Sequence, residues 1–596
     1  MQPVPWPEPD PQVAAAIGAM YGSRKTERPL AVEIRERLGQ WLADEDFAAA
    51  FGIRGRPGWA PSRLALVTVL QRAEKLTDRA AAEAVRARLD WKYLLGLPVD
   101  DPGFDHTVLA EFRGKVAAAG LEQAALDALL AKLAAGGLVK AGGRQRTDST
   151  HVVAAVAALN RLELAGESVR AAVEALAAAH PDWVEQRICV PDWARRYGTP
   201  MTSWRPPASQ AKQDELAITY ARDGYALLEA VYGKSSPAWL RELPAVDVLR
   251  RVLVQNYTRA ITGGKEVIKR REKEPEGDGL PPGHARIASP YDTDARWGVK
   301  REEFWLGCKL HVTETCDDPP PCTCGPAGAA GQAAAGSAGT GAQDRGHDTG
   351  CAHLAFPNLI THVATTDATV TDNQMTTAIC EDLARKNLAP GRSYLDSGYL
   401  SAAVVVSALT TWGIALIGPL LADTSAQARA GAGYARADFT VDYATKTVTC
   451  PQGKRSVSWT PCAQRGKDAI VATFSPGDCG PCPARSLCTT SGRNRRQLTV
   501  LPRDLAEAQA AARAAEKTIP FQADYARRAG VEGTMHQAIS HGARRARYRG
   551  LPKTRLDHVY MACALNLLRL EAFWTGTPLD RQRTSHLARL ELGLVA

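Results

Sequence analysis

Residues 358–419 read NLITHVATTDATVTDNQMTTAICEDLARKNLAPGRSYLDSGYLSAAVVVSALTTWGIALIGP. Three short apolar runs in this stretch predict strands, and two segments with three- and four-residue apolar spacing predict helices between them. The predicted strands are 358–366, 392–396 and 414–419, and the predicted helices are 372–387 and 401–413. Short strands that alternate with helices in this way are typical of parallel sheets. The sequence therefore predicts an α/β fold.

One acidic residue of this stretch, Asp396, follows an apolar run and precedes Ser-Gly-Tyr. Gly398 permits a tight turn there, which keeps the carboxylate at the tip of the predicted strand. Ligands of α/β sheets collect at such strand ends. Asp367 and Asp372 are the local competitors: Asp367 fits a turn, and Asp372 fits the N-cap of the following helix. Asp396 is therefore the candidate for chemistry.

Two further acidic residues have informative surroundings. Asp148, in RQRTDSTHV, is predicted to close a short strand, with a turn-capping aspartate as the alternative. Glu532, in YARRAGVEGTMHQ, is predicted on a helix, where spacings of seven and four residues place Tyr525 and Arg528 on its face. Arg528 is positioned to hold a phosphate, and its alternative role is a surface i,i+4 ion pair with Glu532.

Three carboxylates of this kind can hold two divalent cations, which activate water or a 3′-hydroxyl for attack on a phosphodiester. Magnesium suits this work, because it needs few carboxylates and leaves positions for water and phosphate. We therefore predict Asp148, Asp396 and Glu532 as catalytic ligands for two Mg²⁺ or Mn²⁺ ions.

A basic run follows Glu532. Between positions 527 and 555 there are eight Lys or Arg residues and one acid, Glu532. Such a run usually follows a phosphate backbone, although a solvated charged surface is the alternative. The predicted DNA-contacting residues are Tyr525, Arg528, Arg544, Arg545, Arg547, Arg549 and Lys553.

Size and composition limit the number of structural units and the kinds of partner that the chain can have. A chain of 596 residues with 45% hydrophobic residues can hold about three or four structural units. The net charge of +9 permits a nucleic-acid partner without requiring one. No run of 18 apolar residues and no signal-peptide pattern occurs, so we expect no membrane association and a cytoplasmic protein that joins the nucleoid when bound to DNA.

Cysteines form two groups, which are expected to be thiols or metal ligands in such a compartment. Cys479 and Cys482 have the short spacing of a zinc knuckle, and Cys450 and Cys488 can complete a tetrahedral Zn²⁺ site. Structural zinc and free thiols both remain open for these four. A weaker second group surrounds a stretch with eight Gly and eight Ala at 325–350, which we expect to be a flexible loop. That group is Cys316, Cys322, Cys324, Cys351, His347 and His353.

The separated motifs together resemble a family. RTDSTHV, FWLGCKLHVTET, LDSGYL, YARRAGVEG, RARYRGLPKTRLDH and ACALNLLRL occur in the order found in bacterial insertion-sequence transposases of the DDE type. The chain is similar to the branch whose catalytic helix carries Tyr-x2-Arg-x3-Glu. The resemblance implies a ribonuclease-H-like mixed sheet, with its strands first antiparallel and then joined by helical crossovers. It places the first Asp on the first strand, the second Asp on the fourth and the Glu on a late helix.

The family pattern and the composition together predict the domain plan. A helical N-terminal domain for DNA binding or dimerisation is expected at 1–140, and a helical insertion at 158–289. A small Cys-containing β insertion is expected at 421–515. The catalytic core is then assembled from 141–157, 290–420 and 516–596.

The resemblance also predicts the activity: binding to the element's terminal inverted repeats, metal-dependent strand cleavage, and strand transfer into target DNA by a homodimer on DNA. A nuclease without strand transfer and an inactive DNA-binding descendant are the alternatives. One position departs from the family, which often carries Lys or Arg seven residues after the Glu. Ile539 stands there, and Arg544 or Arg545 is the expected replacement.

Overall fold

The computed structural model describes residues 6–22, 28–52, 58–203, 207–263, 265–272, 279–300, 302–318, 357–431, 434–464 and 466–576. The chain forms two compact units. The first comprises Met1–Gly143, Glu314–Thr361 and Val559–Ala596, and the second comprises Arg144–Thr313 and His362–His558. The predicted Gly/Ala loop lies outside the described residues, as do Cys322, Cys324, Cys351, His347 and His353.

The N-terminal part of the first unit is helical, as predicted. Its helices are α1 (Pro11–Tyr21), α2 (Leu30–Glu33), η1 (Ile34–Leu38), η2 (Asp44–Ala50), α3 (Pro61–Ala73), α4 (Asp78–Ala87), α5 (Leu89–Leu95), α6 (Thr107–Ala118) and α7 (Ala124–Ala135). Helices α6 and α7 are separated by a turn in which Gly120 has a φ of 69°. Helix α1 was not predicted, and Asp10 caps it by accepting hydrogen bonds from the backbone of Gln12 and Val13.

A six-stranded mixed sheet forms the centre of the α/β region. Its path runs β4-β5-β1-β7-β8, and β6 also pairs with β5. Strand β7 pairs in parallel with both β1 and β8, whereas β4 and β5 pair antiparallel. The strands are β1 (Arg144–Val153), β4 (Arg296–Lys300), β5 (Glu303–Thr315), β6 (Ile360–Asp367), β7 (Arg392–Tyr394) and β8 (Ala415–Ile417). The predicted α/β class is confirmed.

The two helices predicted between these strands also form. Helix α13 (Asp372–Arg385) lies between β6 and β7, and α14 (Ala402–Trp412) lies between β7 and β8. Gly413, with a φ of 68°, ends α14 in the left-handed conformation that glycine adopts without strain. None of the helices in the described part of the chain is long and apolar enough to cross a membrane.

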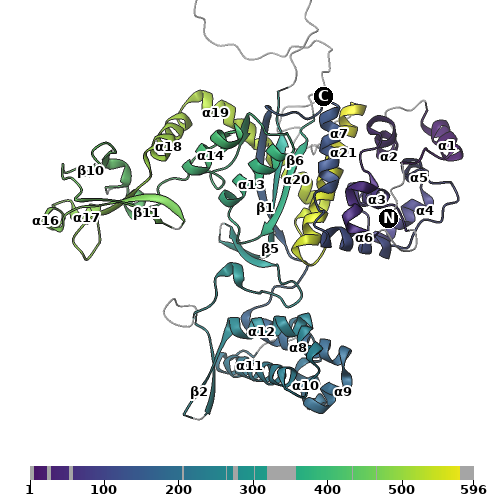
Figure 1. Ribbon diagram of the computed structural model, residues 1–596, viewed down its shortest axis with the longest axis horizontal. Helices are drawn as coiled ribbons and strands as arrows, with labels where there is room; N and C mark the ends of the chain where they lie inside the picture. The colour runs from purple at the N-terminus through teal and green to yellow at the C-terminus, as the bar shows by residue number, and fades with distance from the viewer. Residues whose placement is uncertain are drawn as a thin grey trace, which may run out of the picture. The chain divides into compact units, whose positions relative to one another are not determined.

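A helical segment follows β1 and packs around its own core. Helices α8 (Arg161–Ala179), α11 (Gln210–Tyr232) and α12 (Pro244–Asn256) contact one another, as Figure 1 shows. The shorter helices are α9 (Pro181–Arg187) and α10 (Val190–Tyr197). The sequence analysis missed a hairpin here, β2 (Tyr257–Thr262) with β3 (Lys265–Arg270). Its signal was the Gly263-Gly264 pair between two alternating runs, which is typical of a hairpin turn.

The region predicted as a β insertion contains a three-stranded antiparallel sheet, β11-β12-β13, and a hairpin, β9–β10. The β structure expected in this region is therefore present. Their bounds are β9 (Thr440–Asp442), β10 (Thr447–Thr449), β11 (Ser458–Gln464), β12 (Lys467–Thr473) and β13 (Gln497–Val500). Two four-residue helices, α16 (Pro476–Cys479) and α17 (Arg485–Cys488), lie between β12 and β13, and α18 (Arg503–Glu516) follows.

Candidate active site

Strand register brings the two aspartates to the same level of the sheet. Parallel strands β1 and β7 pair over three residues, and the last pair is Arg146 with Tyr394. Asp148 and Asp396 each lie two residues beyond that pair. Because side chains alternate along a strand, Asp148 shares a face with Arg146. The equal offsets therefore place the two carboxylates near each other at one edge.

One prediction about Asp148 was wrong. Strand β1 does not end at Asp148 but continues to Val153, so the aspartate lies in mid-strand. The continuation of the strand forms backbone hydrogen bonds. The amide of Ala154 donates to the Leu306 carbonyl oxygen at 2.8 Å, and the amide of Val153 donates to the Arg544 carbonyl oxygen at 2.9 Å. Only the parallel pairing with β7 stops at Arg146.

A tight turn holds Asp396 after β7, as predicted. The Gly398 amide donates to Asp396 Oδ1 at 2.9 Å, and a side chain at Gly398 would begin 3.1 Å from that oxygen. The same added carbon would lie 3.3 Å from Asp372 Oδ2, so Asp372 is a neighbour of the turn. Thr371, and not Asp372 as predicted, is the N-cap of α13; Asp372 is its first residue and accepts from Lys309 Nζ at 3.4 Å.

The predicted helix around Glu532 consists of four successive helical segments. They are α19 (Ile519–Tyr525), the 3₁₀ turn η7 (Ala526–Gly530), α20 (Val531–Ala538) and the π turn η8 (Ile539–Ala543). Arg146 explains the change at η7. Its Nη1 donates to the Arg527 carbonyl oxygen at 2.8 Å, and a side chain at Gly530 would begin 1.9 Å from the same nitrogen. Strand β1 thus fixes the segment that carries Arg528.

Arg528 is the residue that joins the three predicted carboxylates. Its Nη2 lies 3.1 Å from Asp148 Oδ2 and 4.0 Å from Asp396 Oδ2, and its Nη1 lies 3.6 Å from Glu532 Oε1. The Asp148 side chain is 16% exposed and that of Glu532 is 71% exposed. The i,i+4 pair considered from the sequence is present, but Arg528 also reaches both aspartates, which spacing alone does not predict.

Burial and charge act in opposite directions on Asp148. Burial raises the pKa of its carboxyl above the ordinary value, the Arg528 guanidinium lowers it, and the nearby Asp396 charge raises it again. Burial likewise raises the pKa of Tyr525, and the charges of Asp396 and Asp148 contribute to the increase. Tyr525 therefore lies within electrostatic range of both aspartates. The net result is a carboxylate pair whose negative charge favours a cation.

The sequence analysis missed a buried polar pair next to this site. Tyr399 is fully buried, and its hydroxyl lies 2.8 Å from His311 Nδ1. Burial lowers the pKa of His311 to about 4 and raises that of Tyr399 well above its ordinary value, with Asp372, Asp148 and Asp396 among the charges acting on Tyr399. The only signal was the presence of Tyr399 in the LDSGYL motif, because His311 comes from β5, far away in the sequence.

Part of the basic run packs against β1. Arg544 Nη1 lies 2.9 Å from the His151 ring nitrogens and 3.2 Å from Thr150 Oγ1, and Arg545 forms a parallel bridge with Val153. Arg545, Arg549 and Lys553 are exposed. Arg547 lies over the Tyr548 ring and Arg549 over the Tyr291 ring. Ile539 begins η8, and Arg544, one of the two expected replacements, follows it directly.

The donor set suits a hard cation, because it consists of carboxylate oxygens that share too much negative charge for one arginine to neutralise. In the described part of the chain, no group of three or more His, Cys, Asp or Glu side chains is already arranged to hold a metal ion. Arg528 stands between the aspartates instead. Its side chain would have to turn away before Asp148, Asp396 and Glu532 could share ions.

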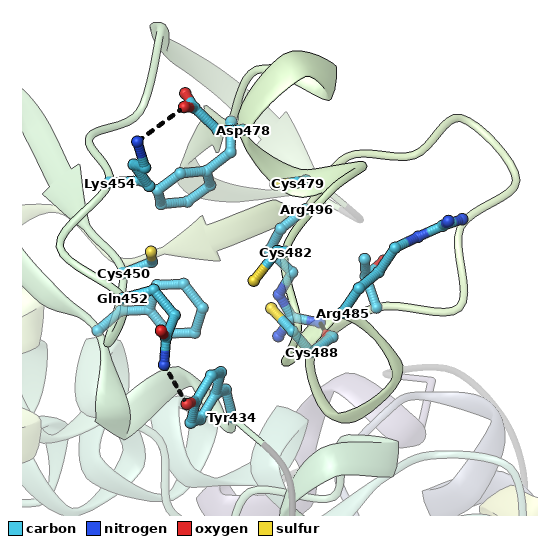
Figure 2. Close-up of a pocket in the computed structure, with 13 residues that line it drawn as sticks. Tyr434, Cys450, Gln452, Lys454, Asp478, Cys479, Cys482, Arg485, Cys488 and Arg496 are labelled. Atoms are coloured by element: carbon cyan, nitrogen blue, oxygen red, sulfur yellow. Dashed lines mark hydrogen bonds and ion pairs between the residues drawn. The ribbon is translucent and has the colours of Figure 1, made fainter.

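A second cluster lies in the β insertion. Figure 2 shows one pocket lined by Cys450, Cys479, Cys482 and Cys488 together with basic residues. Burial raises the pKa of the Cys488 thiol; Arg496 lowers it, and the other three cysteines raise it further. The structure thus brings together the four cysteines singled out in the sequence. The second predicted group contributes only Cys316 to the described residues, where it is buried.

Comparisons with known proteins identify two segments. Residues 449–571 match a family model described as "Transposase DDE domain", and residues 23–115 match one described as "Transposase domain (DUF772)". The first range contains Glu532 and the basic run, whereas Asp148 and Asp396 lie outside both ranges. No curated protein and no solved structure matches the chain. The resemblance drawn from the motifs is confirmed.

Proposed function

We propose that this chain, an insertion-sequence transposase of the DDE type by its motifs and both family matches, cleaves DNA at its element's ends and joins them to target DNA. The observation that carries the proposal is the position of Arg528. One guanidinium reaches carboxylates on β1, on the turn after β7 and on α20. Segments separated by more than a hundred residues thereby converge on a single charged site.

The proposed catalytic fold is ribonuclease-H-like. Supporting it, the sheet combines antiparallel pairing of β4 with β5 and parallel pairing of β1, β7 and β8. With the short strand β4 set aside, Asp148 lies on the first strand of the sheet along the chain and Asp396 follows the fourth. Glu532 lies on a late helix, as the family pattern requires.

The proposed ligands of two Mg²⁺ or Mn²⁺ ions are Asp148, Asp396 and Glu532. When bound, such ions supply Lewis acidity to the attacking and leaving oxygens of a phosphodiester. The exposure of Glu532 leaves it free to move toward the aspartates. Arg528, once its side chain turns away from the aspartates, would be placed to donate two parallel hydrogen bonds to a phosphate.

The chemistry is two successive displacements at phosphorus. A water oxygen first bonds to phosphorus while the bond to the 3′ oxygen breaks, which leaves a 3′-hydroxyl on the element and a 5′-phosphate on the flank. That hydroxyl then loses its proton and attacks a target phosphodiester, and the target's 3′ oxygen leaves. Arg528 and the basic residues beyond it stabilise the added negative charge of each transition state.

DNA contacts are proposed along the basic run. Arg544 is held by His151 and Thr150 and is therefore ordered before DNA arrives. Arg545, Arg549 and Lys553 are exposed and can reach the phosphate backbone. Tyr525 and Arg547 complete the proposed contact set. We assign the helical region 1–140 to DNA binding or dimerisation, and a homodimer on DNA to the joining of two ends.

The first test uses the purified full chain, a labelled duplex carrying the element's own end, and Mg²⁺ or Mn²⁺. Wild type should cleave at the element boundary, and Glu532→Gln should bind the duplex without cleaving it. Strand-transfer products distinguish a transposase from a nuclease that only hydrolyses. Binding without metal-dependent cleavage by the wild type would favour the inactive descendant, and equal cleavage by both proteins would refute the assignment of Glu532.

A further inference from the structure

Three separate segments of the β insertion bring one cysteine or more to the same pocket. Cys450 follows β10 at a turn in which the Gly453 amide donates to the Cys450 carbonyl oxygen and the Cys450 amide donates to that of Lys454, each at 2.8 Å. Cys479 and Cys488 end α16 and α17, and Cys482 lies between those helices. All four line the pocket of Figure 2.

The apolar core of this region is small, and Cys450, Cys479 and Cys488 pack against it only partly buried. It consists of seven buried residues, Phe439, Val448, Ile470, Ala472, Phe474, Leu498 and Val500. Helices α16 and α17 have four residues each and contribute no buried residue. Helices of this length are unstable alone, and small cores usually need a metal or a disulfide as well. The four cysteines form no disulfide in this structure, and four thiols in one pocket are suitable ligands for a metal.

Charge around the pocket fits a bound metal better than neutral thiols. Lys454, Arg485 and Arg496 line it, and Lys454 Nζ lies 3.3 Å from the one acid there, Asp478 Oδ1. Four thiolates and one Zn²⁺ carry a net charge of about −2, which two arginines can balance. Arg496 Nη1 also donates to the Cys488 carbonyl oxygen at 2.7 Å, so one of these cations is fixed directly beside a proposed ligand.

We propose that Cys450, Cys479, Cys482 and Cys488 bind one structural Zn²⁺ that cross-links the β10 turn to α16 and α17. Binding converts four thiols to thiolates and releases four protons as four Zn–S bonds form. The thiols turn toward a common centre to do so. Since the site contains no open position for substrate, its role is structural and separate from the carboxylate site.

The test measures zinc in the full-length protein purified from zinc-supplied medium. Wild type should contain about one equivalent per chain, and Cys482→Ser should contain little. Cys462→Ser is the matched control, because Cys462 belongs to β11 of the same region and does not line the pocket. Less than about half an equivalent in wild type, or equal zinc in wild type and Cys482→Ser, would overturn the proposal.

Cobalt provides a second measurement that does not depend on how Cys482→Ser folds. Metal-free wild type and Cys462→Ser should develop the intense thiolate-to-cobalt absorption of a tetrahedral four-sulfur site when Co²⁺ is added. Cys482→His, which keeps a zinc-binding side chain, should retain the metal with a weaker sulfur band. Absence of that absorption from wild type would contradict four-cysteine coordination.

Discussion

At the edge of β1 and β7, sheet register positions two carboxylates, whereas the four cysteines of the β insertion come from separate segments around a small core. Asp148 and Asp396 inherit their positions from a paired sheet, and Arg528 lies between them. Cys479 and Cys488 end helices in which no side chain is fully buried. One region thus holds its groups before any ligand binds, and the other is expected to need its ligand to hold together.

The largest effect should come from the aspartates. Asp148→Asn or Asp396→Asn removes a charge on which both proposed metal binding and Arg528 placement depend, so cleavage should fall by more than about 100-fold. DNA binding, measured by gel shift at fixed salt, should change little. Cleavage at wild-type rates by either variant would show that register alone does not identify the catalytic pair.

The contact of Arg146 with the Glu532 helix should be the next most sensitive feature. Gly530→Ala displaces the Arg146 guanidinium from the Arg527 carbonyl, which should cost about 1–2 kcal/mol of unfolding free energy. Gly533→Ala is the matched control, because nothing lies within 4 Å of the added carbon, and it should stabilise by up to about 1 kcal/mol. Denaturant unfolding measures both.

Repeating the Gly530→Ala measurement in an Arg146→Ala background separates the loss of the Arg146 contact from the change in helix propensity. There, Gly530→Ala should no longer destabilise, because the side chain that it displaces is absent. If Gly530→Ala is equally harmful in both backgrounds, Arg146 does not cause the break in the helix.

Zinc removal should then affect only one of the two regions. A zinc-selective chelator should increase amide hydrogen exchange in β10 and in α16 and α17, since the proposed cross-link is their main constraint. Exchange in β1 and β7 should stay the same, because those strands are held by sheet pairing. Unchanged protection throughout the β insertion would mean that its core suffices without metal.

The smallest expected effect is a pH-dependent change in melting temperature that has opposite signs for Asp→Asn variants in the two regions. Burial raises the folded-state pKa of Asp148, so its ionised form destabilises the fold once pH rises through that pKa. Asp148→Asn should therefore raise the melting temperature at neutral pH by about 1–2 °C. The gain should disappear in acid, where wild type is protonated as well.

Asp442, in the hairpin of the β insertion, should behave oppositely. Hydrogen bonds from Thr445 lower the pKa of the Asp442 carboxyl. The ionised carboxylate therefore stabilises the fold at pH values above the pKa of the unfolded state. This stabilisation is lost as pH falls through the pKa of the folded state. Asp442→Asn should lower the melting temperature slightly at neutral pH and converge with wild type in acid. The same sign for both variants would show that burial of Asp148 is not the controlling factor.

Much of this was readable in the sequence. The alternating strands and helices of 358–419, the β pieces near the cysteines and the resemblance to DDE transposases required only local periodicity and motif order. The sequence analysis failed where a distant partner decides local structure. Strand β1 continues beyond Asp148 because the backbone carbonyls of Leu306 and Arg544 accept hydrogen bonds from its continuation. The helix that carries Glu532 changes type where Arg146 donates a hydrogen bond to the Arg527 carbonyl oxygen.

The sequence by itself determined the residue types: three acids, an adjacent arginine run and four cysteines at metal-binding spacing. Only the tertiary structure decided that Arg528 reaches all three acids, that Arg544 rests on His151, and that Tyr399 and His311 lie beside them. The physical reason is that spacing along a chain fixes which face a side chain shares with its near neighbours. Distances between segments hundreds of residues apart depend instead on strand register and on what packs over it.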